Sequence, residues 1–311
     1  MILGLFKDNT VNSMSSTASK GEHRAFWKRC LPKSWTKAKP LIPVLRFNGA
    51  IGMASPFRSG LSMASVAASI DKAFAMRGAK AVAIQINSPG GSPVQSTLIF
   101  KRVRALAEEK NLKVYVFAED VAASGGYMLA CAGDEIYADE SSIIGSIGVI
   151  SAGFGFTGLI EKIGVQRRVY TAGANKDTLD PFLPEKPADV KRIKTIQLDV
   201  HQAFIDLVKS RREGKLNKPD KSLFTGEFWT GQPALELGLI DGIADLRTKM
   251  REVYGDGVRF KLVAPSTSWF RRRKGVAVDG SGFNLGALSG ELTEGVISAI
   301  EARALWARFG L

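Results

Sequence analysis

Residues 120–131, Asp-Val-Ala-Ala-Ser-Gly-Gly-Tyr-Met-Leu-Ala-Cys, connect two apolar segments through a serine and two glycines. The apolar run at 114–117 predicts a buried strand, and the residues after Gly126 predict the first turns of a buried helix. Ser124 therefore lies at a strand-to-helix junction, where the N–H groups of the first helical turn favour a negatively charged oxygen. Gly125 and Gly126 leave room for a substrate backbone. The simpler alternative is a serine that caps the helix beside two packing glycines.

A second glycine-rich turn, Asn-Ser-Pro-Gly-Gly-Ser-Pro at 87–93, follows a continuous apolar strand predicted at 81–86. Gly90 and Gly91 permit unusual backbone angles and close approach of a substrate, although a tight turn alone would also explain them. If the N–H of Gly91 points to the same place as those that follow Ser124, the two turns together form an oxyanion hole.

Predicted strands and helices alternate along most of the chain, which indicates an α/β fold with a mostly parallel sheet. An apolar segment with two glycines, at 143–151, lies among them. The predicted strands are 41–47, 81–86, 114–117, 134–138, 166–171 and 240–244, and the predicted helices are 61–76, 94–110, 156–163, 187–212 and 230–237.

The domain organisation follows from composition. With 311 residues, 45% of them hydrophobic, the chain can bury one main core with an extension at each end. We predict a basic flexible leader at 1–40, a folded domain at 41–263, a basic and glycine-rich linker at 264–290, and an amphipathic helix at 291–311.

The distribution of charge and the length of the apolar runs indicate where in the cell the protein is expected. The net charge of +13 is concentrated in the leader and the linker, beside aromatic residues, which suits solvated tails, an anionic membrane surface or nonspecific nucleic-acid binding. We expect no specific nucleic-acid partner. No apolar run approaches the roughly 18 residues of a membrane-spanning helix. We therefore expect a cytoplasmic protein, with peripheral contact at the inner membrane surface as the alternative. Cys30 and Cys131 occupy different contexts and predict no disulfide, and we expect neither a metal nor a cofactor.

Ser124 needs a base, because a serine hydroxyl is a poor nucleophile until a neighbouring group takes its proton. Of the two histidines, His23 lies in the leader and His201 lies inside the predicted long helix, where a partly buried structural role is expected. A lysine is therefore the candidate base. The residue pattern does not select one lysine. Lys176 differs from the others only in following a predicted strand within a glycine-containing loop.

Four motifs, in this order, resemble those of the signal peptide peptidase A / protease IV family of serine peptidases: Asn-Ser-Pro-Gly-Gly-Ser at 87–92, Ala-Ala-Ser-Gly-Gly-Tyr at 122–127, Gly-Ser-Ile-Gly-Val at 145–149, and Lys-Asp at 176–177. The similarity extends over about 41–246. The resemblance implies a ClpP/crotonase-like fold of repeated ββα and βα units with a Ser-Lys dyad. By motif, Ser124 matches the nucleophile, Lys176 the general base, and Ser146 the serine that orients the lysine. Without the family, Ser146 would be interpreted as a small residue in a buried turn.

The resemblance also assigns the glycines. Gly91 and Gly125 match the backbone donors of the oxyanion hole, and we expect Gly90 and Gly126 to line the bound peptide. Single-domain members of the family form rings in which neighbouring protomers supply the serine and the lysine. The sequence thus predicts a serine endopeptidase that hydrolyses signal-peptide remnants or other extended apolar peptides. The alternatives are a crotonase-type acyl-CoA hydratase or isomerase, and a noncatalytic membrane-associated scaffold.

Overall fold

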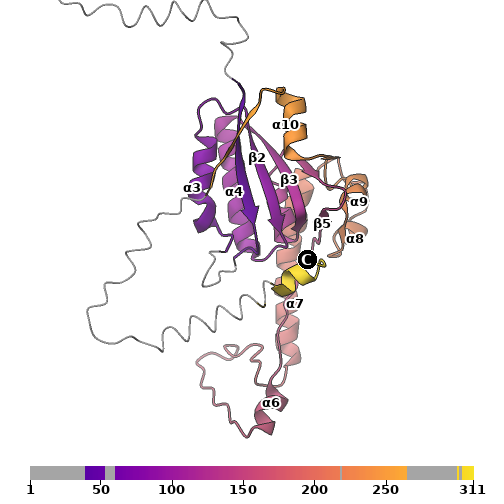
Figure 1. The fold of residues 1–311 in the computed structure, drawn as a ribbon. Helices are drawn as coiled ribbons and strands as arrows, with labels where there is room; N and C mark the ends of the chain where they lie inside the picture. The colour runs from indigo at the N-terminus through magenta and orange to yellow at the C-terminus, as the bar shows by residue number, and fades with distance from the viewer. Residues whose placement is uncertain (1–38, 53–59, 218, 265–299, 301–302) are drawn as a thin grey trace, which may run out of the picture. The chain divides into compact units, whose positions relative to one another are not determined.

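The computed structural model describes residues 39–52, 60–217, 219–264, 300 and 303–311 (Figure 1). The chain divides into two units, 1–39 and 40–311, and the structural description concerns the second. The predicted leader and linker lie almost entirely outside the described residues. Of the predicted C-terminal helix, residues 300 and 303–307 are described and are helical.

The described residues build an eight-stranded sheet in which most neighbouring strands are parallel. Its order is β6-β5-β3-β2-β1-β8, and β4 pairs with both β3 and β7. Only the β5–β6 pair is antiparallel among the described strand pairs, which confirms the predicted mostly parallel α/β architecture. The strands are β1 (Leu41–Asn48), β2 (Ala81–Ser88), β3 (Lys113–Ala123), β4 (Glu135–Ala138), β5 (Ile143–Gly145), β6 (Phe228–Trp229), β7 (Gly242–Ile243) and β8 (Arg259–Leu262).

The five helices whose bounds were predicted are present within a few residues of those bounds, and the helix predicted after Gly126 is α5. Helices α8 and α10 and strands β5, β6 and β8 were not predicted. The helices are α3 (Met63–Phe74), α4 (Pro93–Lys110), α5 (Gly125–Ala130), α6 (Thr157–Lys162), α7 (Pro187–Arg211), α8 (Asp220–Leu223), α9 (Gly231–Glu236) and α10 (Leu246–Tyr254). Helix α4 begins where its sequence indicates, because Pro93 occupies its first turn and the Ser92 side chain accepts from the N–H of Gln95.

The two faces of the sheet bury two separate cores, because side chains alternate along each strand. On one face, strand residues such as Ile84 and Val116 pack with helices α3, α4, α5 and the end of α7. On the other face, Ala83 and Tyr115 pack with α10, which lies apart from α3 and α4 (Figure 1). Each fully buried aliphatic side chain contributes roughly 1.5–3 kcal/mol to the stability of the fold. The two glycine-rich turns follow the carboxyl ends of β2 and β3, so they lie at an edge of the sheet that both cores support.

Residues 149–203, called the extension below, lack a core of their own. Asp189 is the only buried residue among them, and α7 joins the main core through its C-terminal part, at Phe204 and Val208. The predicted strand at 166–171 is wrong for this protomer: these residues are exposed and have no strand assignment. A strand needs a neighbouring strand for its backbone hydrogen bonds, and none of the described residues offers one.

Candidate active site

Ser124 separates β3 from α5 and has an uncommon backbone conformation. Its φ is 53° and its ψ is −123°, a combination that favours glycine and costs about 1–3 kcal/mol for another residue. Although Ser124 is the N-cap residue of α5 by position, its side chain caps none of the helix N–H groups. The simple helix-cap interpretation is therefore wrong, and the hydroxyl is left for another use on a half-buried residue.

Ser146 lies beside Ser124 because their strands are paired. The register of β3 and β5 matches Ala123 with Gly145, so the two serines follow directly from neighbouring parallel strands. The N–H of Ser124 donates to the carbonyl of Gly145 at 2.8 Å. Ser146 has the same φ of 53° and is 4% exposed. The structure thus brings together two of the three predicted catalytic residues.

The four predicted glycines converge on Ser124. A Cβ added to Gly90 would lie 2.7 Å from the Ser124 Cβ, and one added to Gly125 would lie 3.4 Å from the Gly91 nitrogen. Among the described residues, no hydrogen bond uses the N–H of Gly91 or Gly125. These two donors can therefore polarise a carbonyl placed next to the serine.

Close packing holds the 87–93 turn against α5. A Cβ on Gly126 would lie 2.4 Å from the Ser88 carbonyl oxygen, which only glycine permits. The Ser88 hydroxyl donates to the Gly49 carbonyl at 2.7 Å and accepts from the N–H of Gly90 at 3.3 Å. Gly90 in turn accepts from the N–H of Ile51 at 2.8 Å. The glycines therefore set the spacing between the two turns.

Lys176 lies in the extension, on an exposed loop. Its N–H donates to the Gly173 carbonyl at 3.2 Å, and no hydrogen bond or ion pair between described residues joins it to Ser124. The loop is tied to α7 by Arg192, which donates to the side chains of Asn175 at 2.8 Å and Thr178 at 3.1 Å. The lysine loop is therefore positioned by the N-terminal half of α7 (Figure 1).

The point where α7 meets the serine pair lies farther along the helix. The His201 Nε2 is 3.1 Å from the carbonyl oxygen of Ile147, which follows Ser146. Arg192 and His201 are nine positions apart, a rise of roughly 14 Å along an α-helix. Within one protomer, the structure does not bring Lys176 to Ser124. A cleft of about 620 Å³ in the extension is lined by neither residue.

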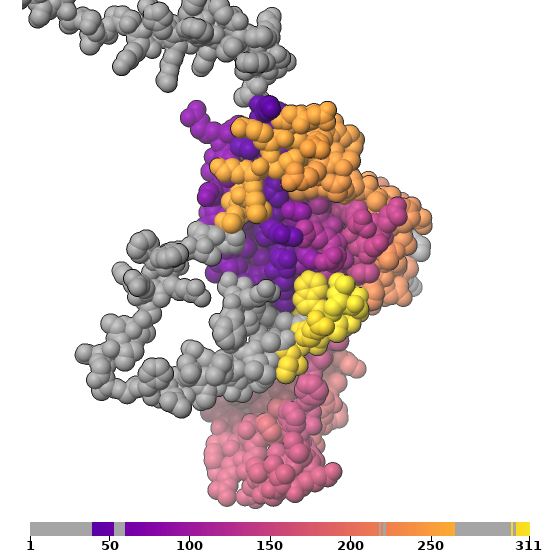
Figure 2. All heavy atoms as spheres, in the orientation of Figure 1, coloured from indigo at the N-terminus to yellow at the C-terminus, as the bar shows by residue number. Residues whose placement is uncertain are grey.

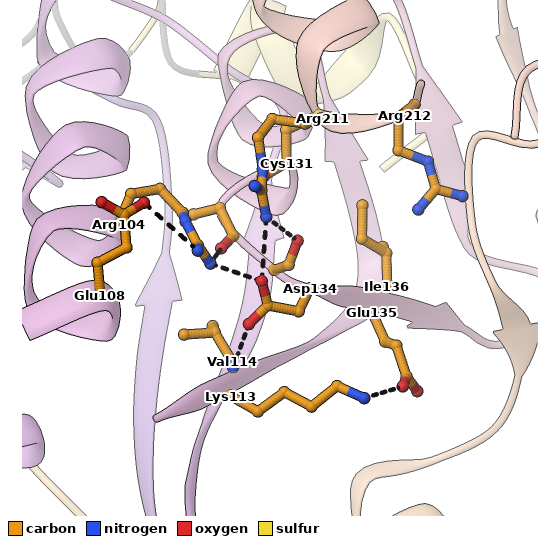
Figure 3. Close-up of polar contacts among 12 residues, drawn as sticks. Arg104, Glu108, Lys113, Val114, Cys131, Asp134, Glu135, Ile136, Arg211 and Arg212 are labelled. Carbon is orange, nitrogen blue, oxygen red and sulfur yellow. Dashed lines mark hydrogen bonds and ion pairs between the residues drawn. The ribbon is translucent and has the colours of Figure 1, made fainter. Parts of the chain in front are cut away.

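The far end of α5 is anchored by arginines that sequence analysis did not single out (Figure 3). Arg211, at the end of α7, donates to the carbonyls of Cys131 and Gly133, each at 3.0 Å. The Asp134 carboxylate accepts hydrogen bonds from Arg211 at 3.2 Å and from Arg104 of α4 at 2.8 Å. These bonds satisfy carbonyls at the C-terminal end of α5, so the helix that starts at the serine is fixed to α4 and α7. Contacts across such sequence separations leave no local signal.

A buried ion pair lies behind this helix. Arg212, 2% exposed, donates to the Gly238 carbonyl and to Asp241 Oδ2, the latter at 2.6 Å. Burial alone would raise the pKa of Asp241, but hydrogen bonds from Arg212 and Lys215 outweigh it and hold the pKa below its ordinary value. Burial raises the pKa of the Cys131 thiol to about 12, so this cysteine is not a nucleophile at neutral pH.

The described residues offer neither a cluster of metal ligands nor a membrane-spanning helix. Their His, Cys, Asp and Glu side chains form no group of three or more that could bind a metal ion. Their helices include none with the length and apolar character required to cross a bilayer.

Comparisons with known proteins match a large part of the chain. The model of "Peptidase family S49" matches residues 106–254. A Brucella abortus protein named "Na(+)/H(+) antiporter NhaA" is 53% identical over 287 residues, which cover 91% of this chain and 39% of that protein. The "Putative signal peptide peptidase SppA" of Enterococcus faecium is 35% identical over 164 residues, covering 53% of this chain and 47% of that protein. The chain thus spans less than half the length of these relatives.

Among solved structures, similarity is found to a mutant of the "1510-N membrane-bound stomatin-specific protease" in complex with a substrate peptide. The identity is 16%, the TM-score is 0.47, and the match covers 74% of this chain and 95% of that one.

Proposed function

Since the chain belongs to peptidase family S49, we propose that it is a serine endopeptidase with Ser124 as its nucleophile. One observation carries this proposal. Ser124 has a strained backbone, and its hydroxyl caps none of the N–H groups of α5. Beside it lie the N–H groups of Gly91 and Gly125, which have no hydrogen-bond partner among the described residues. A cap or a packing serine needs neither the strain nor the adjacent donors.

The reaction proceeds through an acyl-enzyme. Lys176 removes the proton of the Ser124 hydroxyl, and the oxygen attacks the peptide carbonyl while Gly91 and Gly125 donate to the developing oxyanion. The proton passes to the leaving amine as the C–N bond breaks. Water then attacks the ester, releases the carboxylic acid and regenerates the serine. Ser146 holds the lysine in the direction of the nucleophile.

The lysine comes from a neighbouring copy of the chain in a ring. Within one protomer, the lysine loop is attached to α7 roughly 14 Å along the helix from the serine pair. The extension also exposes large apolar side chains, which mark an interface when they occur together. Figure 2 shows the extension, in pink, projecting beyond the sheet. These exposed side chains are Ile150, Phe154, Leu159, Ile163, Val165, Val169, Tyr170, Ile196 and Leu198.

Extended apolar peptides, signal-peptide remnants among them, are the proposed substrates. Val94 and Leu98 are 65% and 45% exposed on the first turns of α4, directly after the Gly91 turn. Phe228, 43% exposed, pairs with Gly145 on the other side of the serines. Apolar surface therefore flanks the nucleophile on both sides. We further assign the domain to the ClpP/crotonase-like type and place the protein in the cytoplasm or at the inner membrane surface.

Mixing of inactive subunits tests whether Ser124 and Lys176 form a dyad and whether the two residues come from neighbouring copies of the chain. Ser124→Ala and Lys176→Ala should each abolish cleavage of an apolar fluorogenic peptide, whereas Lys162→Ala, which removes another exposed lysine of the extension, should leave cleavage intact. After equimolar co-refolding of the two inactive variants, about a quarter of the sites combine an intact serine with an intact lysine from the neighbour. Recovery of about that fraction of wild-type activity supports sharing. Two inactive variants that never recover together would contradict it.

The alternatives from sequence analysis predict different results. An acyl-CoA hydratase or isomerase would turn over acyl-CoA and would not react with a fluorophosphonate, which attacks activated serines. A scaffold would bind liposomes without cleaving peptides. A fluorophosphonate adduct together with peptide cleavage excludes both.

A further inference from the structure

The turn at 145–148, called the Ser146 turn below, has an unusual backbone. Gly145 has a φ of +108° and Ser146 a φ of 53°. A Cβ on Gly148 would lie 2.9 Å from the Gly226 Cα, so the turn also packs closely against the loop before β6. Sparsely populated conformations of this kind persist only where the surroundings hold them.

Three successive residues of the Ser146 turn are each held by a different element. The Gly145 carbonyl accepts from the N–H of Ser124 at 2.8 Å, and the N–H of Ser146 donates to the Glu227 carbonyl at 2.6 Å. The third bond joins the Ile147 carbonyl to the ring of His201 at 3.1 Å. The first two bonds join backbone atoms and use no side chain. The third depends on one side chain.

His201 must donate in this contact, because a carbonyl oxygen can only accept. Both the neutral ring with its proton on Nε2 and the protonated ring provide that donor. Ile147 is fully buried, so its carbonyl has little access to water as a substitute partner. His201 also lies on α7, the helix that carries the lysine loop through Arg192.

We infer that His201 is a positioning residue: its hydrogen bond to the Ile147 carbonyl fixes the Ser146 turn, and thereby aims the Ser146 hydroxyl that orients the catalytic lysine. This inference rests on the proposed function. The hydrogen bond of His201 is to the Ile147 carbonyl and not to Ser124, so His201 acts through the turn. The hydrogen bond crosses 54 residues of sequence, which is why the helical pattern alone indicated only a structural histidine.

A pair of substitutions separates donation from packing. His201→Gln places an amide N–H near the position of Nε2, whereas His201→Met fills similar space without a donor. We expect His201→Met to lower kcat about tenfold, equivalent to about 1.4 kcal/mol, with KM unchanged, and His201→Gln to stay within about twofold of wild type. Gln202→Leu, at the next and exposed position of α7, is the matched control and should keep wild-type kcat.

Hydrogen exchange gives a readout that does not depend on catalysis. Amides of the peptide that contains 143–150 should exchange several-fold faster in His201→Met than in wild type, and at the wild-type rate in His201→Gln. If the proposed function fails, the wild-type protein cleaves nothing, yet this exchange pattern still tests whether the hydrogen bond from His201 holds the Ser146 turn. Unchanged exchange and kcat in a folded His201→Met protein would overturn the inference. If His201→Met does not fold, a folded His201→Gln protein with a tenfold lower kcat would overturn it equally.

Discussion

Gly90→Ala places one methyl group against the nucleophile, and its effect follows from the geometry. The added Cβ would lie 2.7 Å from the Ser124 Cβ, 2.9 Å from the Gly125 nitrogen and 3.0 Å from the Ala123 carbonyl oxygen. To reach an ordinary contact of 3.4 Å, the Ser124 side chain or the turn must move by 0.7 Å (3.4 minus 2.7). The φ of +103° adds backbone strain of about 1–3 kcal/mol.

We expect this displacement to reduce kcat/KM about 100-fold, because a misplacement of about 1 Å between reacting groups costs that much. The free energy of unfolding should fall by about 2 kcal/mol, mainly from the backbone strain. Peptide cleavage and urea unfolding of the purified protein measure the two effects.

Gly78→Ala separates the contact from the strain. Gly78 also has a positive φ, +81°, but an added Cβ there meets nothing within 4 Å. This variant should lose stability and retain cleavage. A folded Gly90→Ala protein that cleaves at the wild-type rate would refute the placement of Gly90 beside the reacting serine.

Three further predictions concern the serine, the buried ion pair and the cysteine. Ser124→Gly should abolish turnover yet raise the free energy of unfolding by about 1 kcal/mol, since glycine adopts the strained conformation readily; a less stable variant would contradict the strain. Asp241→Asn should lower stability by about 3 kcal/mol at pH 7, because Arg212 loses its charged partner. The pKa of Asp241 is lower in the folded than in the unfolded state, so its contribution is present above about pH 4 and is lost as the pH falls through the folded value; the variant's acid-unfolding curve should lack that loss. With Cys30 replaced by serine, Cys131 should react with iodoacetamide at pH 8 only as fast as the protein unfolds, because burial raises its pKa to about 12; rapid labelling of the native protein would show that the thiol is accessible.

Local sequence signals predicted the elements that build the serine side of the site. The apolar run before Ser124 and the glycines after it specified a strand, a turn and a helix, and β3 and α5 have that arrangement. Pro93 and Ser92 predicted the start of α4. Proline restricts its own φ, and serine caps neighbouring N–H groups, so both signals act within a few residues.

The features that were predicted wrongly, or not predicted at all, depend on atoms distant in sequence. The segment at 166–171 contains residue types that are common in strands, but pairing requires a neighbouring strand that the described residues do not supply. The positive φ of Ser124 and Ser146 is imposed by tertiary packing, and a serine in the sequence does not predict it. The hydrogen bond of His201 to Ile147 is likewise tertiary. Whether Lys176 reaches a serine depends on a second copy of the chain, and it stays a prediction.

Mass-spectrometric mapping of a fluorophosphonate adduct tests the central claim, that Ser124 is an activated nucleophile. The wild-type protein should carry one phosphonyl group per chain on the peptide that contains Ser124. Ser124→Ala should carry none, and Lys176→Ala should label far more slowly than wild type because its serine keeps its proton. An adduct on any other serine, or undiminished labelling of Ser124→Ala, would contradict the account.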